Sequence, residues 1–156
     1  MACLSMGKQK VGALIVIEHT TPLDEVVRTG EIIDAAISQR LIENIFFKNS
    51  PLHDGAMVIR DGKIYAAGCI LPLTKKLVSS SLGTRHRAGI GLTEESDALV
   101  VIVSEETGAI SVAKGGILQK DVSYGDLRDI LTTQFIPSGS SDDDKIINKL
   151  VRRIKK

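Results

Sequence analysis

A short, nearly uninterrupted hydrophobic run, Val11–Ile17, constrains the fold more than any other part of the chain. The run is rich in β-branched residues, which predicts a central strand that is buried on both faces. Asp97–Val103 has the same character and predicts a second strand of this kind. A strand buried on both faces needs a covering layer on each side. We therefore predict an α/β fold, a central mixed β-sheet surrounded by helices, in a single domain.

Two further strand-like runs, Ala56–Arg60 and Lys63–Leu71, flank the pair Asp61-Gly62. An Asp-Gly pair between two such runs is a strong signal for a β-hairpin. Ala109–Lys114 is expected to form another strand, which Gly115-Gly116 ends. The sequence therefore predicts at least five strands in the central sheet.

Hydrophobic residues recur at helical spacing between Ile32 and Phe46, which predicts an amphipathic helix over residues 34–47. Asp34 suits the first turn of such a helix, because the helix macrodipole is positive there. Shorter helical segments are predicted at Leu23–Arg28, at Arg85–Glu95 with Thr84 as the N-cap, and at Tyr124–Thr132.

The two ends of the chain are expected to lie outside the main domain, which we place at residues 11–135. Residues 1–10 are expected to be an added start or linker, and the native protein is expected to extend further upstream. Residues 136–156 begin with a Ser-, Gly- and Asp-rich stretch that is typical of a flexible break. They end in Lys145–Lys156, whose aliphatic spacing and basic end predict an amphipathic C-terminal helix.

Charge and aromatic content argue against several classes of protein. Lys and Arg number 20 against 19 for Asp and Glu, and aromatic residues make up 3% of the chain, with no Trp. A nearly neutral chain with few stacking groups gives no case for nucleic-acid binding, so any anion site must be local. Cys3 and Cys69 form no disulfide framework, which fits a reducing, cytosolic environment. No hydrophobic run is long enough to be a transmembrane helix.

The segment Leu52–Ala56 carries the first candidate for chemistry, Asp54. A carboxylate on a tight loop can hold a metal ion or accept a proton. Gly55 has no side chain and lets another group approach the backbone closely. The alternative is that Asp54 only stabilises a turn, as loop aspartates commonly do. His53 is a metal ligand, a phosphate contact or a plain loop histidine.

Arg85, His86 and Arg87 form the second candidate, a basic cluster in the first turn of a predicted helix. Cations at this end of a helix oppose the macrodipole, and a bound polyphosphate would reverse that penalty. The alternative is a solvated basic patch that pairs with nearby acidic residues, Glu94, Glu95 or Asp97. Both interpretations fit this motif.

The third candidate, Ser104-Glu105-Glu106, follows the predicted buried strand. Ligands commonly bind at strand ends in α/β sheets, so one glutamate can hold a divalent cation while Ser104 contacts phosphate. Because neighbouring side chains point to different faces, we expect only one of the two glutamates to serve. The alternative is an ordinary acidic turn.

Several familiar motifs are absent from the sequence. It contains no GxxxxGK[ST] phosphate-binding loop and no GxGxxG after a strand, which removes the commonest classes of ATPase and dehydrogenase. It also lacks GxSxG and HExxH, the signatures of many esterases and metalloproteases.

Three segments, in order, resemble the motifs of the diadenylate cyclase domain. Leu52–Ala56 resembles its DGA motif, and Gly83–Ala88 resembles its RHR motif. Val103–Gly108, followed by Ile110–Ala113, resembles its third motif. The similarity covers residues 11–131 and is greatest to the membrane-linked bacterial type, whose cytosolic catalytic domain follows several transmembrane helices.

This resemblance implies that two ATP molecules condense to cyclic di-AMP with release of two pyrophosphates. Cyclic di-AMP is two-fold symmetric, and one site per chain holds one ATP, so the simplest catalyst is a face-to-face homodimer. Each 3′-hydroxyl then attacks the α-phosphate of the other ATP. Two other functions stay open: a catalytically silent nucleotide-binding sensor, and another metal-dependent phosphoryl-transfer enzyme such as a nucleotide hydrolase.

The resemblance also implies roles for individual residues. Asp54 would assist the 3′-hydroxyl and, with Glu106, hold the metal. The implied catalytic set is Asp54, Arg85, His86 and Arg87, where Arg87 supports the phosphate contacts. The implied ATP-binding set is Gly55, Ala56, Leu71, Gly83, Thr84, Arg85, His86, Ser104 and Glu105. Leu71 would line the adenine pocket, and the residue before it, aromatic in some relatives, is Ile70 here.

The family implies a divalent cation, Mn²⁺, Mg²⁺ or Co²⁺, as cofactor. Its membrane-linked members imply two partners for the full-length protein, a membrane-bound regulator and phosphoglucosamine mutase. By the same resemblance, this part of the protein would be a cytoplasmic domain, anchored in the cell membrane by upstream helices that the sequence does not contain.

Overall fold

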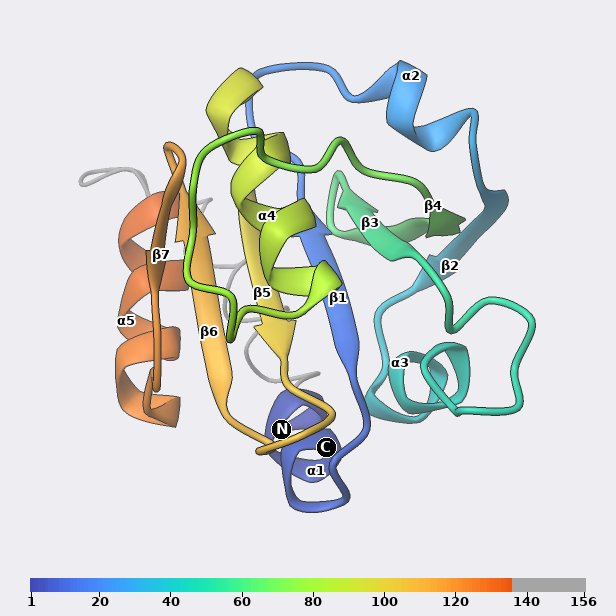
Figure 1. Cartoon of the computed structure of the whole chain (residues 1–156). Helices are drawn as coiled ribbons and strands as arrows, with labels where there is room; N and C mark the ends of the chain where they lie inside the picture. Colours follow the sequence, from blue (N-terminus) through green and yellow to red (C-terminus); the bar gives the residue numbers. More distant parts are fainter. Residues whose placement is uncertain (136–156) are drawn as a thin grey trace.

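The structure, a computed structural model, describes residues 1–135 and is organised around a seven-stranded sheet (Figure 1). The strand order is β2-β4-β3-β1-β5-β6-β7, in which β1 and β3 pair parallel and all other neighbours pair antiparallel. The strands are β1 (Ala13–Ile17), β2 (Glu31–Ala36), β3 (Ala56–Arg60), β4 (Lys63–Cys69), β5 (Leu99–Val103), β6 (Ile110–Lys114) and β7 (Ile117–Gln119). The helices are α1 (Ala2–Lys8), α2 (Asp24–Val27), α3 (Gln39–Ile45), α4 (Thr84–Glu95) and α5 (Tyr124–Phe135). The predicted mixed sheet surrounded by helices is confirmed.

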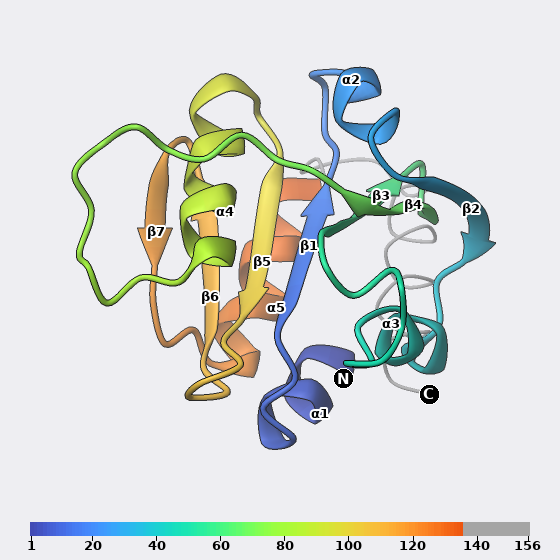
Figure 2. The same ribbon diagram turned by 45° about the vertical axis from the view of Figure 1, so that its right-hand side comes forward.

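Strand β1 lies at the centre of the sheet and packs on both faces, as its composition predicted. Leu14 and Val16 belong to the core beneath α4, whereas Ala13 and Ile15 belong to the core that α1, α3 and α5 cover. Figure 2 shows α4 in front of the sheet and α5 behind it. All five residues of β5 are buried as well. A fully buried aliphatic side chain contributes about 1.5–3 kcal/mol, so these two strands account for much of the stability of the sheet.

The predicted hairpin is formed by β3 and β4. Asp61 and Gly62 both have positive φ, 50° and 70°, which is the conformation of a type I′ turn. This turn matches the right-handed twist of the two strands that it connects.

The predicted helix over residues 34–47 is wrong in its first half. Residues 31–36 form β2, an edge strand that pairs with β4. The register of that pair shifts between Ile32 and Ala35, and Asp34 has a φ of 46°, so the strand contains a bulge. An extra residue in a bulge breaks the two-residue alternation, which made the hydrophobic pattern resemble that of a helix. The helix itself, α3, begins after Ser38, whose hydroxyl accepts a hydrogen bond from the Leu41 N–H (3.1 Å).

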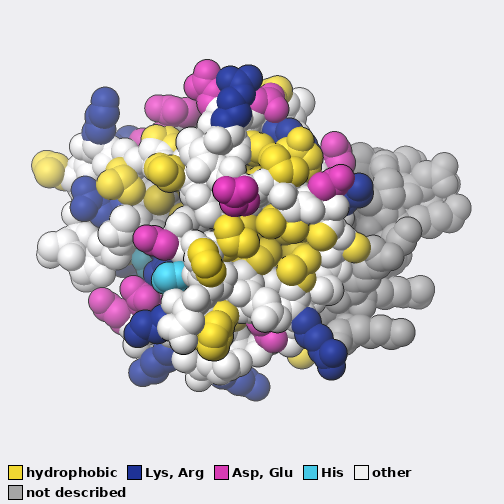
Figure 3. Space-filling model, turned by 90° about the vertical axis from the view of Figure 1, so that its right-hand side faces the viewer, with side chains coloured by type: hydrophobic (Ala, Val, Ile, Leu, Met, Phe, Trp, Pro, Cys, Tyr) yellow, Lys and Arg dark blue, Asp and Glu magenta, His cyan; other side chains and the backbone are white. Residues whose placement is uncertain are grey.

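The side of the molecule that carries β2 and α3 presents hydrophobic side chains between acidic and basic ones (Figure 3). Ile32 and Phe47 are each 57% exposed. Lys63 pairs with Asp34 at the bulge (3.0 Å), which places opposite charges along this edge. Charges and a bulge of this kind discourage another chain from pairing with an edge strand.

The first residues of the chain differ from the linker that we expected. They form α1, in which Met6 is 1% exposed and belongs to the same core as Phe46. A Cβ on Gly7 would lie 2.5 Å from the Gly108 carbonyl oxygen, so this helix sits directly on the loop before β6. The predicted break and helix of residues 136–156 lie outside the described residues. Within residues 1–135, none of the helices is long and apolar enough to cross a membrane.

Helix α4 begins one residue earlier than predicted, because its N-cap is Gly83 and Thr84 is already helical. Gly89 and Gly91 lower the intrinsic helix propensity of this segment but allow close packing. A Cβ on Gly89 would lie 3.0 Å from Ile102 Cδ1, and one on Gly91 would lie 2.2 Å from the Pro72 carbonyl oxygen. Tertiary packing therefore stabilises a helix that the local sequence disfavours.

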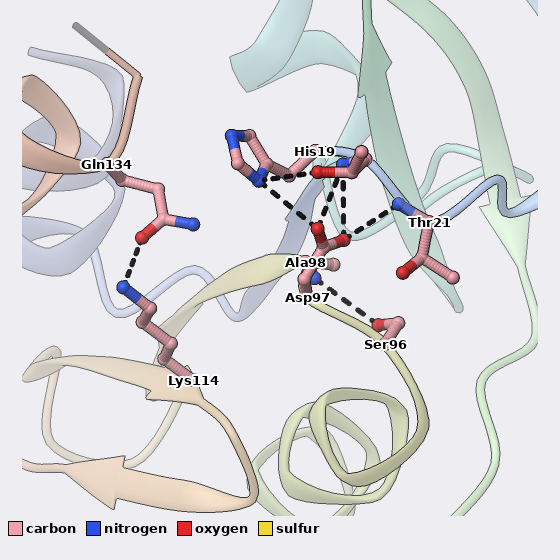
Figure 4. Close-up of polar contacts among 8 residues, drawn as sticks. His19, Thr21, Ser96, Asp97, Ala98, Lys114 and Gln134 are labelled. Atoms are coloured by element: carbon pink, nitrogen blue, oxygen red, sulfur yellow. Dashed lines mark hydrogen bonds and ion pairs between the residues drawn. The ribbon is translucent and has the colours of Figure 1, made fainter. Parts of the chain in front are cut away.

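The carboxylate of Asp97 connects the end of β1 to the start of β5 (Figure 4). It accepts hydrogen bonds from the backbone N–H groups of Thr20 (3.1 Å) and Thr21 (2.9 Å), and it lies 3.2 Å from His19 Nδ1. The hydrogen bonds from Thr20 and Thr21 hold the pKa of Asp97 well below its ordinary value. The ionised carboxylate is therefore a tether between two central strands.

We expect Asp97→Asn to lower the melting temperature at pH 7, at a cost on the order of 1 kcal/mol because the side chain is 39% exposed. A group whose pKa is lowered by folding stabilises the protein above its unfolded-state pKa and loses this contribution as the pH falls. The difference between wild type and Asp97→Asn should therefore shrink as the pH falls below about 4. Thermal unfolding from pH 3 to pH 7 measures this, with the exposed Asp129→Asn as control. A difference that does not depend on pH would contradict the prediction.

Candidate active site

A cleft of about 760 Å³ lies at one end of the central strands of the sheet. The starts of the parallel strands β1 and β3 meet the ends of β5 and β4 at this end, because Ala13 pairs with Val103 and Ala56 pairs with Cys69. The first turn of α4 completes the wall. The residues that line the cleft are Leu14, His53, Asp54, Gly55, Gly68, Cys69, Ile70, Leu71, Leu73, Ser81, Gly83, Thr84, Arg85, His86, Ala88, Val103, Ser104, Glu105 and Glu106.

The structure brings nearly all the predicted site residues to this cleft, although they come from four separate parts of the chain: residues 54–56, Leu71, residues 83–87 and residues 104–106. Two of them do not line it. Ala56 has no exposed surface and packs in the core beneath the cleft, and Arg87 is exposed but lies outside the lining. Ala56 therefore supports the floor without offering a surface to a ligand.

The loop before β3 has a shape that only glycine permits at position 55. Gly55 has a φ of 143°, and a Cβ there would lie 2.7 Å from the carbonyl carbon of Gly68 and 2.9 Å from the Cys69 carbonyl oxygen. The loop thus rests directly on the end of β4 and places the exposed Asp54 at the cleft. The His53 ring donates from Nδ1 to the Ser50 carbonyl oxygen (2.7 Å), so only its Nε2 is left for a ligand.

The first turn of α4 brings positive charge to the cleft. No acidic residue lies in this turn, and the N-cap residue, Gly83, has no side chain that could accept a hydrogen bond. The backbone N–H groups of the first turn of α4 therefore have no side-chain cap. A helix N-terminus with free N–H groups favours an anion. Burial lowers the pKa of His86, Lys120 and Arg85 lower it further, and Glu106 opposes them. The positive surroundings that disfavour a charged imidazole would favour a bound anion.

Two of the three acidic residues that we considered as partners of the basic cluster, Glu94 and Asp97, are engaged elsewhere. Glu94 pairs with Lys76 (3.2 Å) and accepts a hydrogen bond from the Thr74 hydroxyl (2.9 Å), and Asp97 binds the end of β1. Arg85 instead pairs with Glu105, with Nη1 3.4 Å from Oε1. Its side chain is 21% exposed, so the interpretation as a solvated patch does not describe Arg85.

The segment after β5 is a tight turn. Ser104 Oγ accepts hydrogen bonds from the N–H groups of Glu106 and Thr107 (both 3.2 Å), and the Gly108 N–H donates to the Ser104 carbonyl oxygen (2.9 Å). Both Glu105 and Glu106 line the cleft, so the expectation that their side chains point to different faces is wrong. The alternation of side chains applies to extended strands and does not hold in a turn. That only one of the two serves stays a prediction.

One part of the cleft is apolar. Leu71 is buried, whereas Ile70 and Leu73 are 69% and 47% exposed, and Leu14 contributes from β1. Leu14 could not be recognised from the sequence as part of the cleft, because it has the same aliphatic character as the core residues beside it in β1. Leu73 could not be recognised either, because nothing in a long polar loop marks which side chain turns inward.

A protein-family model for the DAC domain, described as "DisA bacterial checkpoint controller nucleotide-binding", matches residues 1–118, more than half of the chain. The chain belongs to the DAC family. Cyclic di-AMP synthase CdaA of Bacillus subtilis is 44% identical over 131 residues, which are 83% of this chain and 48% of that protein. A diadenylate cyclase of Listeria monocytogenes is 45% identical over 132 residues, 84% of this chain and 48% of that protein. The chain therefore spans about half the length of these curated relatives.

Solved structures support the same assignment for this DAC domain. A crystal structure of a DacA double mutant from Staphylococcus aureus superposes with a TM-score of 0.85 at 47% identity, covering 87% of this chain and 91% of that one. A hypothetical membrane spanning protein from Bacillus cereus, also 47% identical, superposes with a TM-score of 0.74, covering 77% of this chain and 59% of that one.

The donor set of the DAC domain fits a divalent cation that a nucleotide helps to hold. Within residues 1–135, no group of three or more His, Cys, Asp or Glu residues forms a complete metal site. Asp54 and Glu106 nevertheless both line the cleft. Mg²⁺ in nucleotide enzymes is commonly bound by one or two carboxylates together with substrate phosphates, which matches two carboxylates beside a basic turn.

Proposed function

We propose that this DAC domain is a diadenylate cyclase, which condenses two ATP molecules to cyclic di-AMP and two pyrophosphates. One observation carries the proposal: a single cleft joins the carboxylates of Asp54 and Glu106 to the basic first turn of α4 and to an apolar wall. An adenine ring suits the apolar wall, and a triphosphate suits the helix N-terminus. Relatives that cover most of this chain are named as cyclic di-AMP synthase and diadenylate cyclase, which supports the same activity.

In the proposed reaction the 3′-oxygen of one ATP forms a bond to the α-phosphorus of the other. The bond between that phosphorus and the oxygen that bridges to the β-phosphate breaks, and pyrophosphate leaves with its electron pair. Asp54 orients the 3′-hydroxyl and receives its proton, while Arg85 balances the charge of the leaving pyrophosphate and the His86 imidazole donates a hydrogen bond to it. A divalent cation held by Asp54 and Glu106 would supply further charge neutralisation. The same step on the second ATP closes the ring.

Incubation with ATP and Mn²⁺, followed by chromatography of the nucleotides, tests the activity. The cyclase yields cyclic di-AMP and pyrophosphate. A nucleotide hydrolase would yield ADP or AMP instead, and a catalytically silent sensor would leave ATP intact. Either of these two outcomes would overturn the proposal. Repeating the assay with Mg²⁺ and Co²⁺ identifies the preferred cation.

We expect Arg85→Ala to weaken the binding of a non-hydrolysable ATP analogue by about tenfold or more, because a charge-assisted contact to phosphate contributes roughly 1.5–3 kcal/mol. Lys75→Ala is the matched control, since Lys75 is exposed and does not line the cleft. Isothermal titration calorimetry of the two variants gives both affinities. Equal affinities would mean that the basic turn does not contact the triphosphate.

Activity is expected to depend on dimer formation, because residues 1–135 of each chain form one cleft that joins carboxylates to the basic turn, and the reaction joins two ATP molecules. Specific activity should rise with protein concentration until the dimer saturates. In a mixture of wild type with excess Asp54→Asn, a mixed dimer can form one linkage but not the second. It should release a linear dinucleotide with a 5′-triphosphate, which mass spectrometry detects. Specific activity that is constant over a wide dilution series, without linear product, would rule out this mechanism.

The cellular setting is part of the proposal. We infer that the full-length protein is anchored in the cell membrane by helices upstream of this domain. The relative from Bacillus cereus is named as a hypothetical membrane spanning protein, which supports this setting. A membrane-bound regulator and phosphoglucosamine mutase are the proposed protein partners. Recovery of the full-length protein in the membrane fraction tests the anchoring. A pull-down from solubilised membranes tests whether the regulator and phosphoglucosamine mutase bind to it.

A further inference from the structure

The residue before strand β1, Gly12, lies directly against the side chain of Arg85. A Cβ on Gly12 would be 2.5 Å from Arg85 Nη1, 2.8 Å from Arg85 Cζ and 3.1 Å from Glu105 Cβ. A real Cβ atom does not lie within 3.0 Å of another heavy atom in this way, so the guanidinium occupies the space that any larger residue at position 12 would fill. Gly12 is buried and has no positive φ, so its backbone does not itself require glycine.

The space left by Gly12 forms a seat for the Arg85 guanidinium. Arg85 benefits from such a seat because its side chain is long and has many rotamers. An unrestrained arginine loses much conformational entropy when it binds a ligand, whereas a guanidinium that is already held loses less. Two contacts hold this one: the Gly12 backbone on one side, and Glu105 Oε1 at 3.4 Å from Nη1. Together they hold the guanidinium at the wall of the cleft, and the Arg85 side chain as a whole is 21% exposed.

We propose that Gly12 is a positioning residue for Arg85, and that its missing side chain makes the seat from which the guanidinium binds nucleotide phosphate. The ligand in this inference rests on the proposed function, but the seat itself does not. Gly12 acts through Arg85 and has no side chain with which to contact the substrate.

The character of the neighbours predicts what a substitution at Gly12 does. At Gly91 an added Cβ would meet backbone atoms of Pro72 and Thr74, which cannot move without shifting the chain. At Gly12 the two nearest atoms belong to the far end of a flexible side chain, and the third, Glu105 Cβ, is far enough away to yield by a few tenths of an ångström. The fold should therefore tolerate Gly12→Ala, and the guanidinium of Arg85 should be displaced.

A double-mutant cycle tests the inference through binding of a non-hydrolysable ATP analogue. Gly12→Ala and Arg85→Ala are each expected to weaken binding by about tenfold, and the double variant should bind no more weakly than Arg85→Ala alone. The control is Gly125→Ala, where the nearest atom to an added Cβ is Ser123 Oγ at 3.8 Å and binding should be unchanged. Wild-type affinity in Gly12→Ala, or a further loss in the double variant beyond Arg85→Ala, would overturn the inference.

A readout without nucleotide separates this inference from the proposed function. The Arg85 side-chain Nε–H signal in a ¹H–¹⁵N NMR spectrum is assigned by its absence in Arg85→Ala. It should shift in Gly12→Ala and stay in place in Gly125→Ala, while the melting temperature of Gly12→Ala stays within about 5 °C of wild type. An unshifted signal would overturn the inference even if the protein makes cyclic di-AMP. A shifted signal in a protein that binds no ATP would support the seat and remove the proposed function.

Discussion

Asp54→Asn is expected to abolish cyclic di-AMP formation while the fold stays intact. The substitution keeps the size of the side chain and removes the negative charge that would orient the 3′-hydroxyl, accept its proton and help to hold the cation. General-base catalysis alone contributes about 10²–10⁴-fold to a rate, so a loss of at least this size is expected. The loop should survive because its shape depends on Gly55 against the end of β4, and Asp54 itself is exposed. Chromatography of the nucleotide products measures the loss, and thermal unfolding measures stability.

Asp61→Asn is the matched control for this prediction. Asp61 is also exposed in a loop, but it does not line the cleft. Its φ of 50° in the hairpin turn is one that asparagine tolerates. Asp61→Asn should keep both activity and melting temperature. A large fall in the melting temperature of Asp54→Asn would instead show that Asp54 is a structural turn residue, which is the alternative that its sequence context left open.

Gly91→Ala is expected to have the largest effect on stability, a loss of about 3 kcal/mol or more. Its added Cβ would lie 2.2 Å from the Pro72 carbonyl oxygen, 2.7 Å from the Thr74 N and 2.8 Å from the Leu73 carbonyl carbon. All three are backbone atoms, and the Thr74 N–H also donates to the Arg87 carbonyl oxygen (3.1 Å), which ties this segment to α4. Relief of the clash must therefore move α4 away from its neighbour.

The same shift should reach the cleft, because α4 carries the basic turn and the segment against it carries the apolar wall. Chemical denaturation gives the free energy of unfolding of Gly91→Ala beside that of Gly125→Ala. Gly125 lies in α5 with room for a methyl group, so alanine there should leave the stability unchanged or raise it by about 0.5–1 kcal/mol. Similar free energies for the two variants would show that the close approach of α4 is not a packing constraint.

Elements whose signals are local could be predicted from the amino-acid sequence. The aliphatic runs predicted β1 and β5, because a strand buried on both faces must be apolar throughout. The Asp-Gly pair predicted the β3–β4 hairpin, because only a few residue types adopt the positive φ of its turn. The three short motifs also predicted most of the polar residues that line the cleft. Their roles in binding phosphate and a cation stay predictions.

Features that depend on partners distant in sequence became visible only in the folded chain. Residues 31–36 are a strand because β4 is available to pair with them, and no local pattern reports a bulged edge. Arg85 pairs with Glu105 and lies against Gly12, although it follows Gly12 by 73 positions in the sequence. Such contacts form only when the folded sheet brings distant segments of the chain together. The sequence does not distinguish a glycine that is needed for a turn from a glycine that makes room for a distant side chain.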